Sequence, residues 1–108
     1  MITIRRYLTR SGGIPVTEWL DGLRDRKAKT AIMARIFRLE QGIEGDFKKL
    51  GGGLSELRVF VGPGYRVYYA KEGSTFVLLL CGGDKSTQNT DIERARRYLA
   101  DWREREGD

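Results

Sequence analysis

Residues 54–95 read LSELRVFVGPGYRVYYAKEGSTFVLLLCGGDKSTQNTDIERA, and they predict three strands and the helix that follows them. Alternating apolar and polar residues on both sides of the Gly-Pro-Gly sequence at residues 62–64 are typical of a β-hairpin. Residues 76–80 are apolar without interruption, as in a strand that is covered on both faces. The sequence Thr-Asp-Ile-Glu at residues 90–93 has the pattern of a capping box and predicts the start of a last helix.

The hairpin brings two arginines together. Side chains two residues apart on a strand lie on one face of the sheet. If residues 62–64 form the turn, Val61 stands opposite Tyr65, and Arg66 and Tyr68 share the face of Arg58. A slip of one residue would send the two arginines to opposite faces. The other face is the expected core, with Leu57, Val59, Val61, Tyr65, Val67 and Tyr69.

The first half of the chain adds a strand and two helices. Residues 3–8 alternate and are β-branched at the start, which predicts a strand. Pro15 suits the first turn of a helix, and a second helix is expected to begin near Asp25. Residues 46–53 close with three glycines and are expected to form a loop. The apolar face of the second helix is expected to hold Ala28, Ile32, Ile36, Leu39 and Ile43.

The predicted element order is therefore β-α-α-β-β-β-α. This order indicates an α+β fold, in which a small, mostly antiparallel sheet packs against an N-terminal helical hairpin and a C-terminal helix. A chain of 108 residues is expected to form one domain, residues 1–108.

The composition restricts the partners and the chemistry. Twenty lysines and arginines against fifteen acidic residues give a net charge of +5, which favours a polyanion or an acidic protein as a partner. Cys81 is the only cysteine and histidine is absent, so no internal disulfide, zinc cluster or cofactor is expected. The first ten residues are too polar for a signal peptide, and no apolar run approaches the ~20 residues of a membrane span. A cytoplasmic protein is expected.

Several of these motifs resemble those of a known family. They are the N-terminal strand, the helical pair that begins near Pro15, the hairpin with ELR and GPGYRVYY, and the segment LLLCGGDKSTQNTDIERA. In these features the chain is similar, over nearly its whole length, to the RelE/ParE superfamily of type II toxins, the addiction-module killer proteins. The resemblance implies a RelE-like fold and a neighbouring antitoxin, commonly a helix-turn-helix protein in the HigA style, which binds the toxin in a hetero-oligomer.

Two activities occur in this superfamily. RelE- and HigB-like members cleave mRNA, usually in the ribosomal A site, whereas ParE-like members poison DNA gyrase. The resemblance matches Arg58 to the sheet arginine that meets phosphate in RNA-cleaving members, Arg66 to the arginine of the GYR motif, and Lys85 to a basic residue after the final strand. The chain departs from the best-known nucleases in lacking a catalytic-type histidine and any tyrosine in its last helix before Tyr98. The proton-transfer group is therefore unassigned.

RNA cleavage through attack of the 2′-OH needs alignment, stabilisation of charge on the phosphoryl oxygens, and two proton transfers. The guanidinium forks of Arg58 and Arg66 match phosphate oxygens. The structural alternative for Arg58 is a solvated strand residue paired with Glu56 or Glu72, and that for Arg66 is a salt-bridge partner that holds the hairpin. Lys85 is a candidate general base or charge stabiliser, or else a solvated loop lysine.

Five further residues complete the candidate site, each with a structural alternative. Asp84 orients that lysine or accepts a proton, or is a turn residue after two glycines. Lys48 and Lys49 track the RNA backbone or only solubilise their loop. Tyr68 is the best candidate for stacking on a base, and Gln88 for a hydrogen bond to a base or phosphate, although aromatic hairpin residues and loop amides are often structural.

Residues and resemblance together predict an mRNA endoribonuclease toxin that acts at the ribosome without a metal and is held inactive by its antitoxin. Two alternatives stay open. One is a ParE-like toxin that inhibits DNA gyrase, and the other is a degenerate member that only binds the antitoxin and co-represses its operon. The paired sheet arginines followed by GGDK favour the nuclease.

Overall fold

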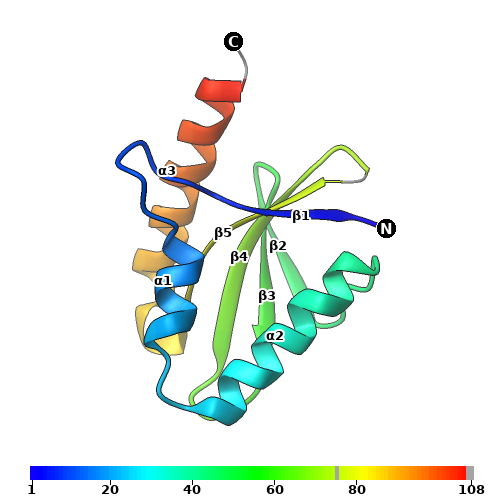
Figure 1. Cartoon of the computed structure of the whole chain (residues 1–108), viewed down its shortest axis with the longest axis vertical. Helices are drawn as coiled ribbons and strands as arrows, with labels where there is room; N and C mark the ends of the chain where they lie inside the picture. The colour runs from blue at the N-terminus through cyan, green and yellow to red at the C-terminus, as the bar shows by residue number, and fades with distance from the viewer. Residues whose placement is uncertain (75, 107–108) are drawn as a thin grey trace.

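The computed structural model describes residues 1–74 and 76–106 and has an α+β fold with a five-stranded mixed sheet and three α-helices (Figure 1). As expected, this architecture is compatible with a small RelE-like fold. In chain order the elements are β1 (Thr3–Arg6), α1 (Pro15–Gly22), α2 (Arg26–Glu40), β2 (Phe47–Gly51), β3 (Leu54–Val59), β4 (Tyr65–Glu72), β5 (Phe76–Asp84), the short 3-10 helix η1 (Lys85–Thr87) and α3 (Gln88–Glu106).

The sheet has the strand order β1-β5-β4-β3-β2. β1 runs parallel to β5, and the other three neighbouring pairs are antiparallel, which confirms the mostly antiparallel sheet. β5 has a neighbour on each side, and its residues from Val77 to Gly83 are buried. The uninterrupted apolar run predicted a covered central strand correctly, because a strand between two layers has no wet face.

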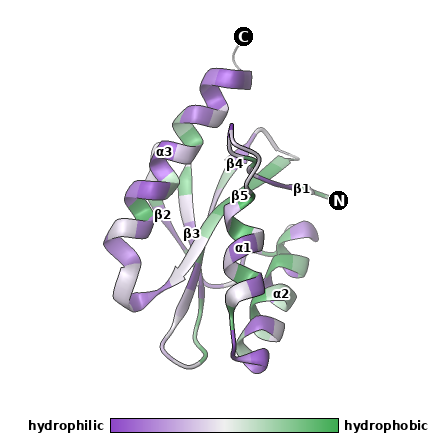
Figure 2. Ribbon diagram, turned by 60° about the vertical axis from the view of Figure 1, so that its left-hand side comes forward, coloured by the Kyte–Doolittle hydropathy of each residue, from purple (hydrophilic) through white to green (hydrophobic). Residues whose placement is uncertain are grey.

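Helices cover both faces of the sheet, with α1 and α2 on one side and α3 on the other (Figure 1). In Figure 2 hydrophobic and hydrophilic residues alternate along α2 and α3, as in helices that bury one stripe. The α1–α2 side buries Val16, Leu20, Ala28, Ile32, Ile36, Leu39, Leu57, Val59, Tyr65, Val67, Tyr69, Val77 and Leu79. The α3 side buries Tyr7, Leu54, Tyr68, Ala70, Leu78, Leu80, Cys81, Ala95 and Leu99.

The β3–β4 hairpin keeps the predicted faces with a different register. Val59, and not Val61, pairs with Tyr65, so the turn is longer than the Gly-Pro-Gly sequence. This shift of two residues leaves every side chain on its predicted face, because faces alternate with a period of two. Arg58 pairs directly with Arg66 in this register, and both point away from the α1–α2 side.

Residues 46–53 are not a loop as expected, since they contain β2. Phe47 pairs with Leu57 and packs on the α1–α2 side, while Lys48 and Lys49 are exposed. A lysine pair next to three glycines does not read as a strand. An edge strand tolerates such residues because only one of its sides is paired, and the hydrogen bonds to β3 override the weak local preference.

The boundaries of two helices also differ from expectation. α3 begins at Gln88, so Thr90 lies inside the helix and is not its cap. Asp84 caps η1, which leads directly into α3. α2 ends at Glu40, and Ile43 is exposed beyond it instead of extending the apolar face.

α2 also positions the hairpin. The helix begins next to Asp25 as predicted, and Asp25 caps it, because its carboxylate accepts the backbone N–H groups of Lys27 and Ala28 at 3.0 and 3.1 Å. From the inner side of α2, the Arg35 guanidinium donates to the carbonyl oxygens of Arg58 at 2.6 Å and Asp46 at 3.0 Å. The backbone that carries Arg58 is therefore held by a charged group.

No helix in the described part of the chain is long and apolar enough to cross a membrane.

Candidate functional site

Arg58, Arg66 and Lys85 gather at the turn end of the β3–β4 hairpin. Arg58 and Arg66 are direct cross-strand partners, and Arg66 is in turn paired with Gly83 of β5. The Lys85 N–H donates to the carbonyl of Gly64 at 3.0 Å, which ties η1 to the turn. A hollow of about 270 Å³, called here the hairpin hollow, is lined by Phe60, Gly62, Pro63, Gly64, Arg66 and Lys85.

Arg58 is held by an acid from the segment before β2. Its Nη2 and Nε atoms lie 2.9 and 3.3 Å from Oδ1 of Asp46, and its guanidinium carbon lies 5.9 Å from the centre of the Phe60 ring. The Nη1 atom of Arg58 takes no part in these two bonds. The side chain is 34% exposed, so the pair orients the guanidinium without burying it. The predicted partners Glu56 and Glu72 are wrong for Arg58, because the ion pair goes to Asp46.

Arg66 has the salt-bridge role that was the structural alternative for it, and its role toward phosphate stays a prediction. Its side chain is only 11% exposed, and its Nε lies 3.8 Å from Oε2 of Glu56, an ion pair that is too long for a hydrogen bond. Glu56 is itself 1% exposed and accepts a hydrogen bond of 3.2 Å from the Gln88 amide. This buried carboxylate joins β3, β4 and the first residue of α3. Arg66 therefore contributes to the fold and also lines the hairpin hollow.

Replacing Glu56 by glutamine is expected to lower stability by about 1–2 kcal/mol, because the buried Arg66 charge loses its counter-ion while the side chain keeps its shape. Thermal unfolding followed by circular dichroism measures the change. Glu93→Gln, at an exposed position of α3, is the matched control and should unfold like the parent. Equal melting temperatures for all three proteins would show that the Glu56 charge does not support the site.

Tyr68 is buried and is therefore not available to stack on a base. It lies on the Arg58 face as predicted, but α3 covers this part of the sheet and the side chain is fully buried. Burial, with the neighbouring Glu56 carboxylate, raises the pKa of the Tyr68 hydroxyl. The hydroxyl has no hydrogen-bond partner within the described residues. Tyr68 and Arg58 share one face of the sheet. α3 covers the part of this face that holds Tyr68 but leaves Arg58 partly exposed.

Gln88 and Asp84 are both used by the fold. Gln88 is half-buried and its amide is committed to Glu56. Asp84 accepts the backbone N–H of Ser86 at 2.8 Å and the Ser86 hydroxyl at 2.5 Å, the arrangement of a helix cap. These bonds hold the pKa of Asp84 below its ordinary value, with the Ser86 hydroxyl as the largest cause. The turn role therefore suits Asp84 better than proton acceptance.

The lowered pKa of Asp84 predicts a specific pH dependence. Because the folded state favours the ionised carboxylate, the stabilisation is present above its ordinary pKa of 3.8 and is lost as the pH falls through the lower folded value. Carboxyl carbon NMR should give Asp84 a titration midpoint below the ordinary aspartate value of 3.8. Replacing Ser86 by alanine should raise the midpoint. A midpoint at or above the ordinary value would contradict the cap.

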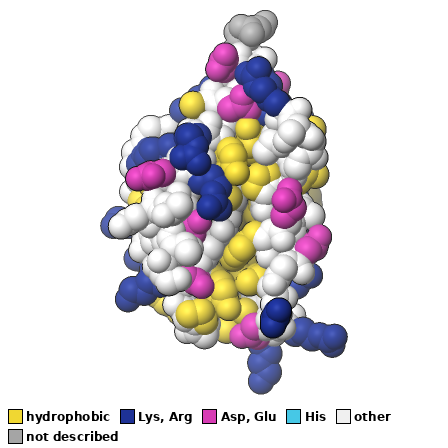
Figure 3. Space-filling view, turned by 90° about the vertical axis from the view of Figure 1, so that its left-hand side faces the viewer, with side chains coloured by type: hydrophobic (Ala, Val, Ile, Leu, Met, Phe, Trp, Pro, Cys, Tyr) yellow, Lys and Arg dark blue, Asp and Glu magenta, His cyan; other side chains and the backbone are white. Residues whose placement is uncertain are grey.

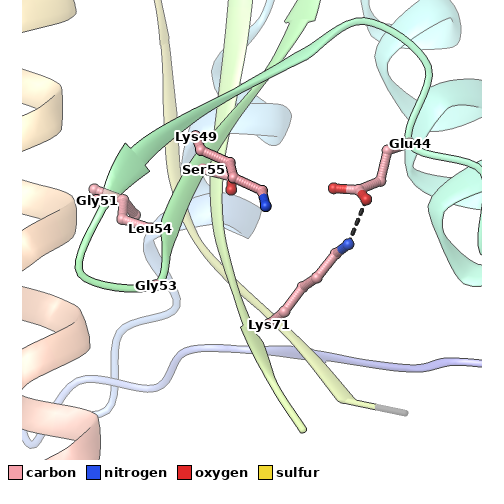
Figure 4. A pocket seen from close by; sticks show the side chains of 7 residues that line it. All are labelled: Glu44, Lys49, Gly51, Gly53, Leu54, Ser55 and Lys71. Carbon is pink, nitrogen blue, oxygen red and sulfur yellow. Dashed lines mark hydrogen bonds and ion pairs between the residues drawn. The ribbon is translucent and has the colours of Figure 1, made fainter. Parts of the chain in front are cut away.

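Lys48 and Lys49 cannot track one RNA backbone together, because successive strand residues point to opposite faces. Lys48 pairs with Glu56 in the β2–β3 ladder and lies on the arginine face. Lys49 pairs with Ser55 and lines a different hollow with Glu44 and Lys71. Figure 4 shows this hollow, in which Lys71 reaches Glu44 in an ion pair. Only Lys48 shares the face of Arg58.

The two glycines of GGDK have a structural role that the sequence analysis missed. A Cβ at Gly82 would overlap the ring of Trp19 from α1, and a Cβ at Gly83 would overlap the carboxylate of Asp91 from α3. β5 therefore passes between two helices that approach its backbone closely. Asp91 is itself buried and accepts a hydrogen bond of 2.5 Å from the Thr87 hydroxyl. The close contact between Asp91 and Gly83 fixes the end of β5, and Lys85 follows directly after it.

A third hollow, of about 520 Å³, lies between α1 and α3, where Figure 3 shows a strip of hydrophobic side chains. It is lined by Trp19, Cys81, Gly82, Arg94 and Tyr98 among others. Cys81 is buried, as expected, and burial raises the pKa of its thiol to about 12. The thiol is therefore protonated at neutral pH and unreactive. Among the described residues, no group of three or more acidic or cysteine side chains is arranged to hold a metal ion.

The sequence did not predict that Asp46 pairs with Arg58 or that Glu56 pairs with Arg66. Asp46 lies twelve residues before Arg58, and no local pattern connects them. Glu56 is two residues before Arg58, a spacing that places both on one face, and this spacing was the available signal. It pointed to the wrong arginine, because the cross-strand neighbour Arg66 is better placed for the ion pair.

Comparison with known proteins gives two matches. Residues 18–100 match the family described as "Phage derived protein Gp49-like (DUF891)". A protein of Haemophilus influenzae, described as an uncharacterized protein, is 50% identical over 78 residues, which cover 72% of this chain and 79% of the relative. The match to the family spans α1 to α3 and includes Arg58, Arg66 and Lys85.

Proposed function

Because the chain belongs to the Gp49-like family of phage-derived proteins, a family associated with toxin–antitoxin systems, we propose that it is a type II toxin that cleaves translated mRNA. The observation that carries the proposal is the cross-strand pair of Arg58 and Arg66, with Lys85 beside it, at the open end of the sheet. Three cations on rigid elements suit a phosphodiester with developing negative charge.

In the proposed reaction, the ribose 2′-OH attacks the adjacent phosphate, and the products are a 2′,3′-cyclic phosphate and a free 5′-OH. The 2′-OH loses a proton and the 5′ oxygen gains one. Arg58 binds the phosphoryl oxygens with its partly exposed guanidinium. Asp46 orients this group, and Arg35 holds the backbone that carries it. Arg66 lines the hairpin hollow and adds a second positive charge. Lys85 is the exposed group assigned to proton transfer or charge stabilisation.

The partners follow from the same proposal. The family context implies a cognate antitoxin, which we assign to a helix-turn-helix protein encoded beside the toxin gene. mRNA bound to the ribosome is the proposed substrate, because the hairpin hollow offers cations that contact phosphate and few groups that read bases. The ribosome would supply the alignment of the scissile bond.

The test is the identity of the damaged nucleic acid. Expression without antitoxin should produce new 5′ ends inside coding regions by primer extension, at about the time when growth stops. The ends should carry 5′-OH groups, which polynucleotide kinase labels directly. Intact mRNA together with DNA breaks would instead indicate gyrase as the target. No growth arrest, with antitoxin binding retained, would indicate a degenerate co-repressor.

A further inference from the structure

The side of α2 that faces away from the sheet, called here the α2 outer face, exposes apolar side chains that the fold does not use. Phe37 is 62% exposed, and Met33, one helical turn before it, is exposed as well. Thr30 and Ala34 form a second exposed row beside them. Residues three and four apart are neighbours on a helix surface. Thr30, Met33, Ala34 and Phe37 therefore make one continuous, largely apolar stripe.

Cations lie next to this stripe. Arg26, Lys27 and Arg38 are exposed, and none of them takes part in an ion pair among the described residues. α2 carries five lysines and arginines but only one acid, Glu40, at its last residue. A shallow hollow of about 400 Å³ runs along the helix between Arg26, Lys27, Thr30, Ala31 and Ala34.

The inner side of α2 is already complete. Ala28, Ile32, Ile36 and Leu39 bury the helix against the sheet, and Arg35 binds backbone carbonyls. The α2 outer face is therefore not needed to hold the helix in place. An exposed phenyl and thioether at helical spacing, next to unpaired cations, is the pattern of a surface that binds an amphipathic helix of opposite charge.

We propose that the α2 outer face is the docking surface for an acidic amphipathic helix of a partner protein, which is the antitoxin if the proposed toxin function holds. Leucine-type side chains of the partner cover Met33 and Phe37, and its carboxylates meet Arg26, Lys27 and Arg38. Charge complementarity selects this partner, because Lys27 and Arg38 border one side of the stripe and Arg26 lies at its N-terminal end. The one acid of α2, Glu40, is the last residue of the helix.

Nucleic acid and membrane fit this face less well. An RNA backbone would pair with the cations but would leave Met33 without apolar cover. A membrane-surface helix buries a broad apolar face, whereas α2 offers only two large apolar side chains outward and is itself packed on the sheet. A protein helix satisfies both the stripe and the charges.

Docking on α2 leaves the cationic site uncovered. α2 packs on one side of the sheet, and Arg58 and Arg66 point to the other. A partner on the α2 outer face therefore inhibits by its bulk, as a clamp that keeps the toxin from the ribosome, and not by occupying the hairpin hollow.

A labelled peptide of about 20 residues, with leucines on one helical face and glutamates elsewhere, tests the docking directly, since shorter isolated helices are marginal in water. Fluorescence anisotropy measures its binding to the purified protein. Phe37→Glu should weaken binding by about 10- to 100-fold, because one buried phenyl is lost and a like charge is introduced. Leu8→Glu, at another exposed apolar side chain remote from α2 in the sequence, is the matched control and should bind like the parent.

Three results would overturn the docking surface. The first is equal binding of the parent to a peptide of the same composition with scattered leucines. The second is unchanged peptide binding by Phe37→Glu. The third is that Phe37→Glu loses binding to an RNA hairpin or to phosphatidylglycerol vesicles but not to the peptide.

An assay in cells separates this proposal from the toxin function. Phe37→Glu should arrest growth like the parent but should no longer be neutralised by the co-expressed antitoxin. If the parent itself fails to arrest growth while the peptide results stand, the toxin function fails and the docking surface survives. If the antitoxin neutralises Phe37→Glu as well as it neutralises the parent, the antitoxin does not bind at the α2 outer face.

Discussion

Replacing Arg58 by alanine is expected to abolish growth arrest and leave the fold intact. The Arg58 side chain is one third exposed and is not part of either buried cluster. Its ion pair with the similarly exposed Asp46 contributes little to stability, because solvent screens such pairs. Loss of one preorganised charge at a transition-state phosphate costs about 2.7–4 kcal/mol, or roughly 100- to 1000-fold in rate.

Two matched variants sharpen this experiment. Arg58→Lys should restore activity only in part, because an ammonium keeps the charge but loses the planar fork. Arg97→Ala, at an exposed position of α3, should be as toxic as the parent. Arg97 is a better control than Arg103, which pairs with Glu72 at 2.9 Å and donates to the Gly52 carbonyl.

The measurements are growth after induction, 5′-end mapping of mRNA, and thermal melts of each purified variant. A folded Arg58→Ala protein that is as toxic as the parent would remove this face of the hairpin from the active site. An unfolded Arg58→Ala protein would show instead that the bond to Asp46 is structural.

Replacing Gly82 by alanine is expected to destabilise the protein severely. The added methyl group would overlap the ring of Trp19, which packs directly on the β5 backbone. Trp19 also contacts the Tyr65 ring, with centroids 6.3 Å apart, so it cannot move without disturbing the hairpin. Overpacking of this kind costs about 3 kcal/mol. For a domain of this size the melting temperature should fall by about 12 °C or more.

Gly22→Ala is the control for this prediction. Gly22 is the last residue of α1, and a Cβ there meets no atom within 4 Å. Alanine in this helix should be neutral or should stabilise the protein by up to about 1 kcal/mol. Differential scanning calorimetry on both variants gives the comparison. If Gly82→Ala melts with the parent, the close approach of Trp19 is not required, and GGDK would owe its glycines to another cause.

Local periodicity was sufficient for most elements. Alternation with a period of two put Arg58 and Arg66 on one face, even though the turn proved two residues longer than expected. Pro15 and Asp25 marked the starts of α1 and α2, because a fixed φ angle and a capping carboxylate act within one helical turn. The strand β2 escaped prediction, since an edge strand of lysines and glycines owes its conformation to β3 and not to its own residues.

The site depended on contacts between distant segments. The amino-acid sequence was enough to place the arginines on the hairpin and to show that the chain is basic, because composition and the alternation of strand faces are local properties. Three features came from the packing of distant segments: Asp46 orients Arg58, Glu56 pairs with Arg66, and α3 buries Tyr68. The physical reason is that burial and ion pairing depend on which surfaces meet when helices pack on a sheet, and this packing is not encoded in the spacing of neighbouring residues.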